Sequence, residues 1–343
     1  MQIARFPRLR LAQLPTPLHP LPRLSRLLGG PEIWVKRDDC TGMAGGGNKM
    51  RKLEFLVADA QAQGADTLIT QGAVQSNHAR QTAAVAASLG LACHVILEER
   101  IADTDEDYAG NGNVLLDRLF GAELQYRPGG TDMAAAMVEL AEQLRAEGRR
   151  PYIIPGGGSN PVGALGYVTA ALELADQARE QGLVIDCLVH GSGSAGTQAG
   201  LVVGVSHYRL GFPVLGISVR APHERQHANV LKLARDTATW AGCPAGITPD
   251  EVLVDAGYVG PGYGVPDERT LEAIVLTART EGVLLDPVYS GKGMAGLIGR
   301  IRQGEFTSHQ RVVFLHTGGA QVLPAYRKVL DAAAADLPQV ITT

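Results

Sequence analysis

Short runs of apolar and β-branched residues alternate along this chain with longer segments whose apolar residues recur at helical spacing. In the first half, this pattern predicts helices over 48–63, 76–89, 112–120, 132–147 and 162–181, and strands over 67–71, 93–97 and 152–154. In the second half, it predicts strands over 187–190, 214–219 and 312–316, and helices from 197 onward and over 223–240, 271–281 and 294–303. Such alternation is typical of an α/β protein with parallel strands.

In α/β sheets of this kind, ligands bind beyond the carboxyl ends of the strands. Three turns rich in small polar residues follow predicted strands, at 71–78, 190–197 and 316–319. We therefore expect a ligand site where these three turns meet. The turns predict the position of the ligand and leave its identity open.

Composition narrows the classes of protein that fit. The chain has 343 residues, 45% of them hydrophobic, and a formal charge of −4. It is too apolar to be disordered and too near neutral to track nucleic-acid phosphates. The length suggests two domains. No run approaches 18 apolar residues, and the Pro-punctuated N-terminal segment lacks an apolar core, so we expect neither a membrane span nor a signal peptide. The four cysteines form no CxxC pair, which favours reduced thiols in a cytoplasm and no metal site.

The segment GGGNKMRKLEF, residues 45–55, carries the first candidate chemistry. Three glycines precede Asn48, which can cap a helix, and Lys49 falls in the first turn of that helix. A helix N-terminus disfavours a cation, so its field lowers the pKa of Lys49 and frees the amine for Schiff-base chemistry. The alternative is a flexible loop followed by a solvated basic helix start.

The segment GSGSAGT, residues 191–197, lies between a predicted strand and a predicted helix. Its backbone N–H groups, the helix dipole and the hydroxyls of Ser194 and Thr197 can hold an anion. The pattern GxGxxG also admits a dinucleotide, and hence a nicotinamide oxidoreductase. The next strand, however, ends at Arg220 and supplies no acidic residue, which favours a single phosphate monoester. A turn packed tightly for steric reasons is the remaining alternative.

Three further segments carry polar groups suited to a substrate. Ser76 and Asn77 open a predicted helix and can cradle a carboxylate, although Ser76 also fits an ordinary N-cap. Tyr263 and Tyr289 lie in glycine-rich loops, and their hydroxyls can orient a substrate or carry protons. Lys292 opens a short helix, where we expect a solvated side chain.

Together these segments resemble the fold type II pyridoxal-phosphate (PLP) enzymes, in the branch of ACC deaminase, D-cysteine desulfhydrase and L-cysteate sulfo-lyase. The motifs that carry the resemblance are IWVKRDDCTG, GGNKMRKLEFL, QGAVQSNHARQTAA, PGGGSNPVGALGY, GSAGTQAG, EGVLLDPVYSGKGMAGL and LHTGG. The resemblance implies two α/β domains, each a mostly parallel twisted sheet flanked by helices. It implies a large PLP-binding domain of residues 1–53 plus 164–343 and a small mobile domain of residues 54–163. It also implies a homodimer.

The resemblance assigns roles to matching residues. Lys49 would be the Schiff-base lysine and the base that moves the Cα proton. Asn77 would support the cofactor ring at its 3′-oxygen. The phosphate would be held by Ser194, Ala195, Gly196 and Thr197. The substrate carboxylate would be received by the segment from Ser76 to His78. Tyr263 and Tyr289 match the two active-site tyrosines of the branch.

Two positions bear on the substrate. Ring-opening deaminases of the branch carry Glu after the second tyrosine and Leu between His and GlyGly, where this chain has Ser290 and Thr317. A hydroxyl facing the pyridine nitrogen stabilises a carbanion less than an acid does, which suits rapid loss of a good leaving group from Cβ. We therefore expect α,β-elimination rather than ACC deamination.

Local strings such as RPGGTDMAAAM and VRAPHERQ are closer to the sulfo-lyase, which releases sulfite from L-cysteate, than to the desulfhydrase, which releases sulfide from D-cysteine. A sulfonate needs fixed donors and positive charge. Arg220 is one candidate, with His78 and the turn 156–159 as others, while a surface salt bridge is the alternative for Arg220. A non-catalytic protein that binds PLP or amino acids remains a rival of another class.

Overall fold

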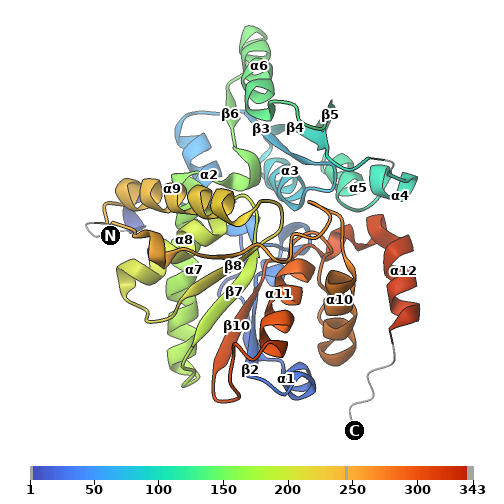
Figure 1. Ribbon diagram of the computed structural model, residues 1–343. Helices are drawn as coiled ribbons and strands as arrows, with labels where there is room; N and C mark the ends of the chain where they lie inside the picture. The colour runs from blue at the N-terminus through green and yellow to red at the C-terminus, as the bar shows by residue number, and fades with distance from the viewer. Residues whose placement is uncertain (1–2, 103, 244–245, 338–343) are drawn as a thin grey trace.

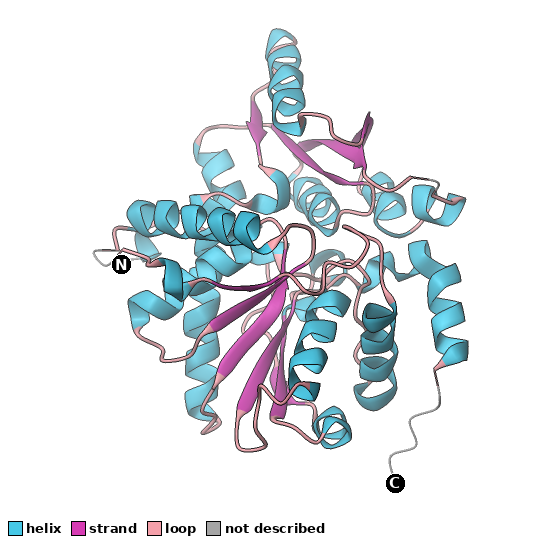
Figure 2. Cartoon of the chain, in the orientation of Figure 1, coloured by secondary structure: helices cyan, strands magenta, loops and turns pink. Residues whose placement is uncertain are grey.

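The computed structural model describes residues 3–102, 104–243 and 246–337, which form two sheets flanked by helices (Figures 1 and 2). The larger sheet has the strand order β1-β2-β10-β7-β8-β9. Its strands are β1 (Leu18–Pro20), β2 (Glu32–Arg37), β10 (Arg311–His316), β7 (Cys187–Ser192), β8 (Val214–Ser218) and β9 (Leu253–Asp255). All neighbours pair in parallel except β1 and β2. β7 and β8 are buried along their whole length, as expected of parallel strands covered on both faces.

The smaller sheet lies above the larger one in Figure 1 and is entirely parallel. Its order is β5-β4-β3-β6, with β5 (Glu123–Pro128), β4 (Ala92–Glu99), β3 (Thr67–Ala73) and β6 (Pro151–Ile153). Side chains of α2 (Lys49–Ala62) and α3 (Asn77–Leu89) share one apolar cluster with β3 and β4. Methionines and leucines of α6 (Met133–Ala146) cover the opposite face. The short helices α4 (Glu106–Gly110) and α5 (Gly112–Leu119) stand at the edge.

Helices cover both faces of the larger sheet. On one face lie α7 (Pro161–Glu180), α8 (Gly196–Tyr208) and α9 (His223–Ala241). On the other lie α1 (Pro22–Leu28), α10 (Glu268–Glu281) and α11 (Ser290–Arg302), with α12 (Arg327–Asp336) beyond α10. The described residues also contain six 3₁₀ helices, at Ile3–Arg5, Asp38–Cys40, Met43–Gly45, Gly156–Gly158, Pro249–Glu251 and Ala320–Tyr326. Within the described ranges, no helix combines the length and apolar character needed to cross a bilayer.

The predicted α/β class with mostly parallel sheets is confirmed, and each predicted helix and strand corresponds to one of these elements. The sequence pattern missed β2, whose EIWVKR run carries charges that hide its place inside the sheet. It also missed the short elements β1, α1, α4, β9 and α12, and the half-exposed strand β5. Helix α11 begins at Ser290, four residues before its predicted start. The sequence pattern missed the first turn of this helix because that turn is rich in glycine.

The predicted domain boundaries remain a prediction. All strands of the smaller sheet lie inside 54–163. The boundaries at 53/54 and 163/164 fall within α2 and α7, so helices rather than loops would link the two domains.

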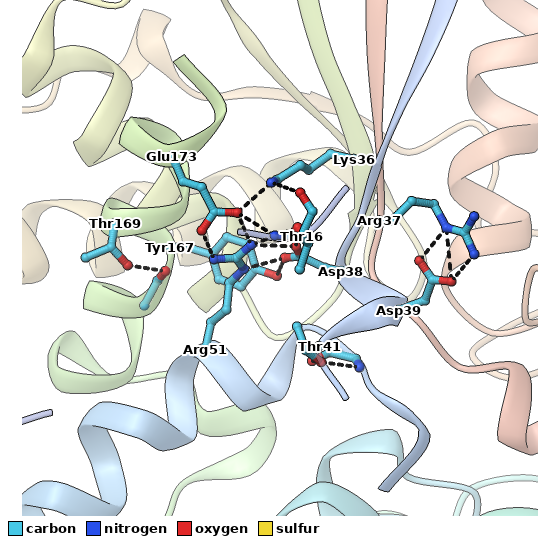
Figure 3. A network of polar contacts seen from close by, with 12 residues as sticks. Thr16, Lys36, Arg37, Asp38, Asp39, Thr41, Arg51, Tyr167, Thr169 and Glu173 are labelled. Atoms are coloured by element: carbon cyan, nitrogen blue, oxygen red, sulfur yellow. Dashed lines mark hydrogen bonds and ion pairs between the residues drawn. The ribbon is translucent and has the colours of Figure 1, made fainter. Parts of the chain in front are cut away.

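A buried ion network fixes α2 against the larger sheet and α7 (Figure 3). Arg51 of α2 donates to Asp38 from Nε and Nη2, at 2.8 Å each, and to Glu173 of α7 from Nη1, at 2.9 Å. Lys36 of β2 also donates to Glu173, and Tyr167 donates to Asp38. Burial opposes ionisation of Asp38, but the Arg51 guanidinium outweighs it and holds the pKa of that carboxyl below its usual value. The network therefore sets the position of the helix that begins with Lys49.

Candidate active site

A cavity opens between the two sheets at the carboxyl ends of β3, β7, β8 and β10. The turns after β3, β7 and β10 all line it, so the three turns singled out in the sequence meet at one place. The predicted site residues that line the cavity are Lys49, Ser76, Asn77, His78, Ser194, Ala195, Thr197, Arg220, Tyr263, Tyr289 and Thr317. Gly196 and Ser290 are not among the lining residues.

Lys49 is the first residue of α2, and its side chain is buried at the floor of this cavity. Burial lowers the pKa of Lys49 to about 8, while a hydrogen bond with Lys52 acts in the opposite direction. The direction agrees with the sequence prediction, but the larger cause is desolvation rather than the helix field named there. A buried amine of this kind is a nucleophile near neutral pH.

Lys52 lies beside this cavity, and the sequence pattern did not single it out. It is fully buried, and its Nζ donates to the carbonyl of Gly157 at 3.1 Å. A Cβ placed on Gly196 would lie 2.9 Å from this Nζ, so the amine lies against the turn at the start of α8. Burial and the neighbouring Lys49 hold the pKa of Lys52 well below its usual value. An anion at this turn would compensate both lysines.

The turn from Gly193 to Thr197 leads into α8 and has the geometry of an anion cradle. Ala195 stands at φ 72° and ψ −35°, a strained conformation for a residue with a Cβ. Gly196 then starts the helix, where a side chain would come within 2.6 Å of Ser159 Oγ. Strain of this kind is typical of ligand-binding turns.

Asn48 ties this turn to α2. The sequence suggested that Asn48 caps α2, but its side chain makes no capping hydrogen bond. Its Nδ2 instead donates to Thr197 Oγ1 at 3.0 Å. The starts of α2 and α8 are therefore held side by side, which brings Lys49 and the cradle together.

Asn77 is oriented by two buried neighbours. Its Oδ1 accepts from Arg80 Nη1 and from Asn113 Nδ2, both at 3.0 Å. Because the amide oxygen is taken, the amide nitrogen is left as a donor. A Cβ on Gly319 would lie 2.8 Å from that nitrogen, so it points toward the turn that contains Thr317.

Ser76 and His78 both line the cavity, with different chemistry. Ser76 is the N-cap of α3 and accepts from the N–H of Ala79 at 3.1 Å. The Thr70 hydroxyl donates to the Ile154 carbonyl, so it must accept from His78 Nε2–H at 2.8 Å. Burial and the nearby lysines hold the pKa of His78 well below its usual value. His78 is therefore neutral and brings no positive charge to a sulfonate, contrary to the suggestion from sequence.

Ser290 faces away from the cavity. Its Oγ donates to Asp286 Oδ1 at 2.6 Å and accepts from the backbone N–H of Asp286 at 2.7 Å. These bonds build the turn that precedes α11. Because Ser290 is bonded within this turn and does not line the cavity, its role in substrate binding stays a prediction.

Tyr263 and Tyr289 form a pair in the cavity wall. Their hydroxyl oxygens are 2.8 Å apart and their rings meet edge to face at 79°.

Lys292, expected to be solvated, is buried, and its Nζ donates to the carbonyls of Val259 and Gly262 at 2.6 Å each. Burial lowers the pKa of Lys292 to about 8. Lys292 is buried rather than solvated because these carbonyls replace water as its hydrogen-bond partners. The same two bonds fix the loop that carries Tyr263.

The comparisons with known proteins agree with this geometry. The family model for the pyridoxal-phosphate dependent enzymes matches residues 9–318. The chain belongs to this family. A crystal structure of an ACC deaminase homologue is 37% identical, with a TM-score of 0.87, and the match covers 96% of this chain and 97% of that one. The L-serine ammonia-lyase of the fungus Rhizomucor miehei is 19% identical, with a TM-score of 0.66 and coverage of 95% and 99%. At that identity the likeness shows the fold alone.

The residues present fit PLP. A strained turn at a helix N-terminus, with the buried Lys52 amine against it, suits a phosphate monoester. Asn77 offers a fixed amide donor on the side of Thr317. Lys49 presents a buried amine of lowered pKa to the same cavity. When bound, PLP supplies an electron sink for the pair of electrons left at the substrate Cα.

Proposed function

We propose that this PLP-dependent enzyme catalyses α,β-elimination from a small amino acid, with L-cysteate as the substrate and pyruvate, sulfite and ammonium as the products. One observation carries the proposal. Among the described residues, no Asp or Glu lines the cavity, whereas Thr317, Arg100 and Arg220 do. A cavity without carboxylates favours an anionic substrate. By the family resemblance, Thr317 would offer a hydroxyl to the pyridine nitrogen of bound PLP, which suits rapid loss of a leaving group.

Different residues of the site would bind the substrate and remove its Cα proton. The helix-capping region of Ser76 and Asn77 would hold the substrate carboxylate through its N–H and amide donors. Lys49 would take the proton from Cα, since burial keeps a fraction of its amine neutral. The electron pair then forms the Cα–Cβ double bond, and the Cβ–S bond breaks with its electrons on sulfur. The released aminoacrylate hydrolyses to pyruvate and ammonium.

Release of sulfite makes small demands on the protein. Sulfite is a weak base, so it can leave without a dedicated acid, whereas sulfide needs more help. Tyr263 and Tyr289, which are hydrogen-bonded to each other, would act as the acid that assists the departure of sulfide. D-cysteine desulfhydration is accordingly the alternative within the eliminating enzymes.

ACC deamination is the second candidate, because the homologue at 37% identity is related to ACC deaminase. Thr317 and the lack of a lining carboxylate weigh against it. A non-catalytic PLP-binding protein is disfavoured, since retention of the cofactor needs the phosphate cradle but not Lys49, Ser76 and a tyrosine pair.

The test is product analysis of the purified, PLP-loaded protein with L-cysteate, D-cysteine and ACC in parallel. We expect pyruvate and sulfite from L-cysteate at much higher efficiency than pyruvate and sulfide from D-cysteine. The reverse preference would establish the desulfhydrase. Formation of 2-oxobutanoate from ACC would establish the deaminase, and turnover of none of them would favour the binding protein.

The predicted homodimer and cytoplasmic location belong to this proposal as well. Analytical ultracentrifugation of the PLP-loaded protein checks the first. Cell fractionation checks the second.

A further inference from the structure

Arg100 is a cavity residue that neither the sequence motifs nor the family match singled out. It follows β4, and its Nε donates to Glu98. Its guanidinium carbon stands 5.1 Å from the centre of the Tyr263 ring. The side chain is 20% exposed and that of Glu98 is 12% exposed. An arginine held by a carboxylate and an aromatic face has little freedom to move, so its remaining N–H groups are fixed donors.

Arg220 faces the same tyrosine pair from the larger sheet. It follows β8 and lines both the active-site cavity and a second, outer cavity that shares Gly193 and Ser194 with the first. Burial raises the pKa of Tyr289, while the hydrogen bond with Tyr263 and then the charges of Arg100 and Arg220 lower it. Both guanidinium groups therefore act on the hydroxyl of Tyr289.

We propose that Arg100 and Arg220 form a subsite for an anionic substituent on the substrate Cβ, and that Arg100 is the residue that determines this specificity. The proposal rests on the proposed elimination reaction. Arg100 comes from the smaller sheet and Arg220 from the larger, so each sheet contributes one cation to the subsite.

The charge change in the reaction explains why two cations suit this place. The sulfonate of L-cysteate carries one negative charge. When the Cβ–S electron pair leaves on sulfur, the departing sulfite carries two. The guanidinium donors, of which that of Arg100 is fixed by Glu98 and Tyr263, would bind the oxyanion in the ground state and stabilise the added charge in the transition state. A neutral thiol or chloride substituent offers nothing to this subsite before the bond breaks.

The test compares substrates that differ in the charge of the Cβ substituent. L-cysteate and O-sulfo-L-serine carry an anion there, and β-chloro-L-alanine does not. In Arg100→Gln we expect kcat/KM for the anionic substrates to fall about 100-fold, the scale for loss of a buried charged partner. For β-chloro-L-alanine we expect a change of less than about threefold. Arg100→Lys keeps the charge and should recover part of the loss, while the exposed Arg118→Gln should change neither substrate class.

The outcomes separate this inference from the proposed function. Equal losses for charged and neutral substrates in Arg100→Gln would overturn the subsite. If the wild type uses O-sulfo-L-serine but not L-cysteate, and the preference for the anion depends on Arg100, the subsite stands and the proposed substrate falls.

If no substrate is eliminated, titration of the holoenzyme with L-cysteate and L-serine, followed by cofactor absorbance, decides the question. A Kd ratio that favours L-cysteate in the wild type and disappears in Arg100→Gln supports the subsite. An unchanged ratio, or no binding of L-cysteate, overturns it.

Discussion

Lys49 and Lys52 lie one helical turn apart, but only Lys49 could be recognised from the sequence. Lys49 has a local signal, because glycines and a helix start surround it. Lys52 has none, and only the fold brings its amine to Gly157 and the start of α8. Burial lowers the pKa of both amines, and each faces the other. A phosphate at the turn would offset this pair of like charges, which makes the cofactor part of the electrostatic balance of the site.

The tyrosine pair permits a prediction at this scale. In Tyr289→Phe, the 2.8 Å hydroxyl contact with Tyr263 is lost, and so is a proton carrier beside the leaving group. We expect turnover of D-cysteine to fall about 100-fold, the lower range for loss of a general acid, and that of L-cysteate to fall less than tenfold. Pyruvate release is measured for both substrates, with Tyr126→Phe on exposed β5 as the control. Equal losses would refute a selective role in sulfide departure.

At the scale of elements, the N-terminus of α8 gathers the groups proposed to bind the phosphate of the cofactor. The strained Ala195, the crowded Gly196 and the Asn48–Thr197 hydrogen bond all lie in its first turn. The helix can take this place because its first half is buried on every side, between the larger sheet, α7 and α9. Rigid burial keeps the N–H groups of the turn aimed at one point.

Gly196→Ala tests whether this turn is the anion site. A Cβ there would lie 2.6 Å from Ser159 Oγ and 2.9 Å from Lys52 Nζ, so the cradle must open. We expect the Kd for PLP to rise about tenfold or more, since overpacking costs about 1–3 kcal/mol. Absorbance titration of the apoprotein measures it. Gly110→Ala, whose Cβ meets nothing within 4 Å, is the matched control. Unchanged affinity in Gly196→Ala would place the phosphate elsewhere.

The ion network of Arg51 yields a second prediction for elements. Arg51→Met leaves Asp38 and Glu173 without their shared partner in the interior, between β2, α2 and α7. We expect the free energy of unfolding to drop by about 3–5 kcal/mol, the cost of breaking a buried pair. Arg302→Met removes an exposed pair with Glu272 and should cost about 0–1 kcal/mol. Urea denaturation measures both, and similar losses in the two variants would argue against the network as the anchor of α2.

At the scale of the whole molecule, the cavity belongs to neither sheet alone. Ser76 and Arg100 come from the smaller sheet, while Ser194, Arg220 and Thr317 come from the larger one. Movement of the smaller sheet would therefore open or close the site around the substrate, which is the role predicted for a mobile domain.

The buried His190 contributes to the pH dependence of stability of the whole molecule. His190 donates from Nδ1 to the Gly191 carbonyl, and its Nε2 has no partner among the residues that the structure describes. Burial lowers the pKa of His190 to about 4. The unfolded chain protonates this group near pH 6.5, so between about pH 6.5 and 4 the unfolded state binds more protons. We expect His190 to lower the free energy of unfolding as the pH is lowered through this window, by up to about 1.4 kcal/mol per pH unit.

A comparison of the wild type with His190→Asn measures the contribution of His190 to the pH dependence of the free energy of unfolding. Burial also holds the pKa of His78 and of His316 below the usual value, but it raises the pKa of Asp117 to about 8, which acts in the opposite direction. The test is therefore the difference between the two proteins: the variant should lose less stability than the wild type as the pH is lowered. Urea unfolding at several pH values between 7 and 5 gives the slope. Identical slopes in the two proteins would mean that His190 is protonated in the folded state.

The sequence by itself determined the features that depend on neighbours along the chain. Helical and strand periodicity predicted the parallel α/β elements, and polar turns after strands marked where Ser76, Ser194 and Thr317 meet. These signals are local, since each depends on a few consecutive residues. β2 escaped them because its buried Lys36 is compensated by Glu173, more than 100 residues away.

Only the tertiary structure decided which charged and polar groups are buried and what they contact. It placed Lys52 at the turn before α8, gave Lys292 two carbonyls in place of water, turned Ser290 toward Asp286, and brought Arg100 over Tyr263. The physical reason is common to all four. The cost of burying a polar group depends on partners that the fold supplies from distant segments, and no local pattern in the sequence records them.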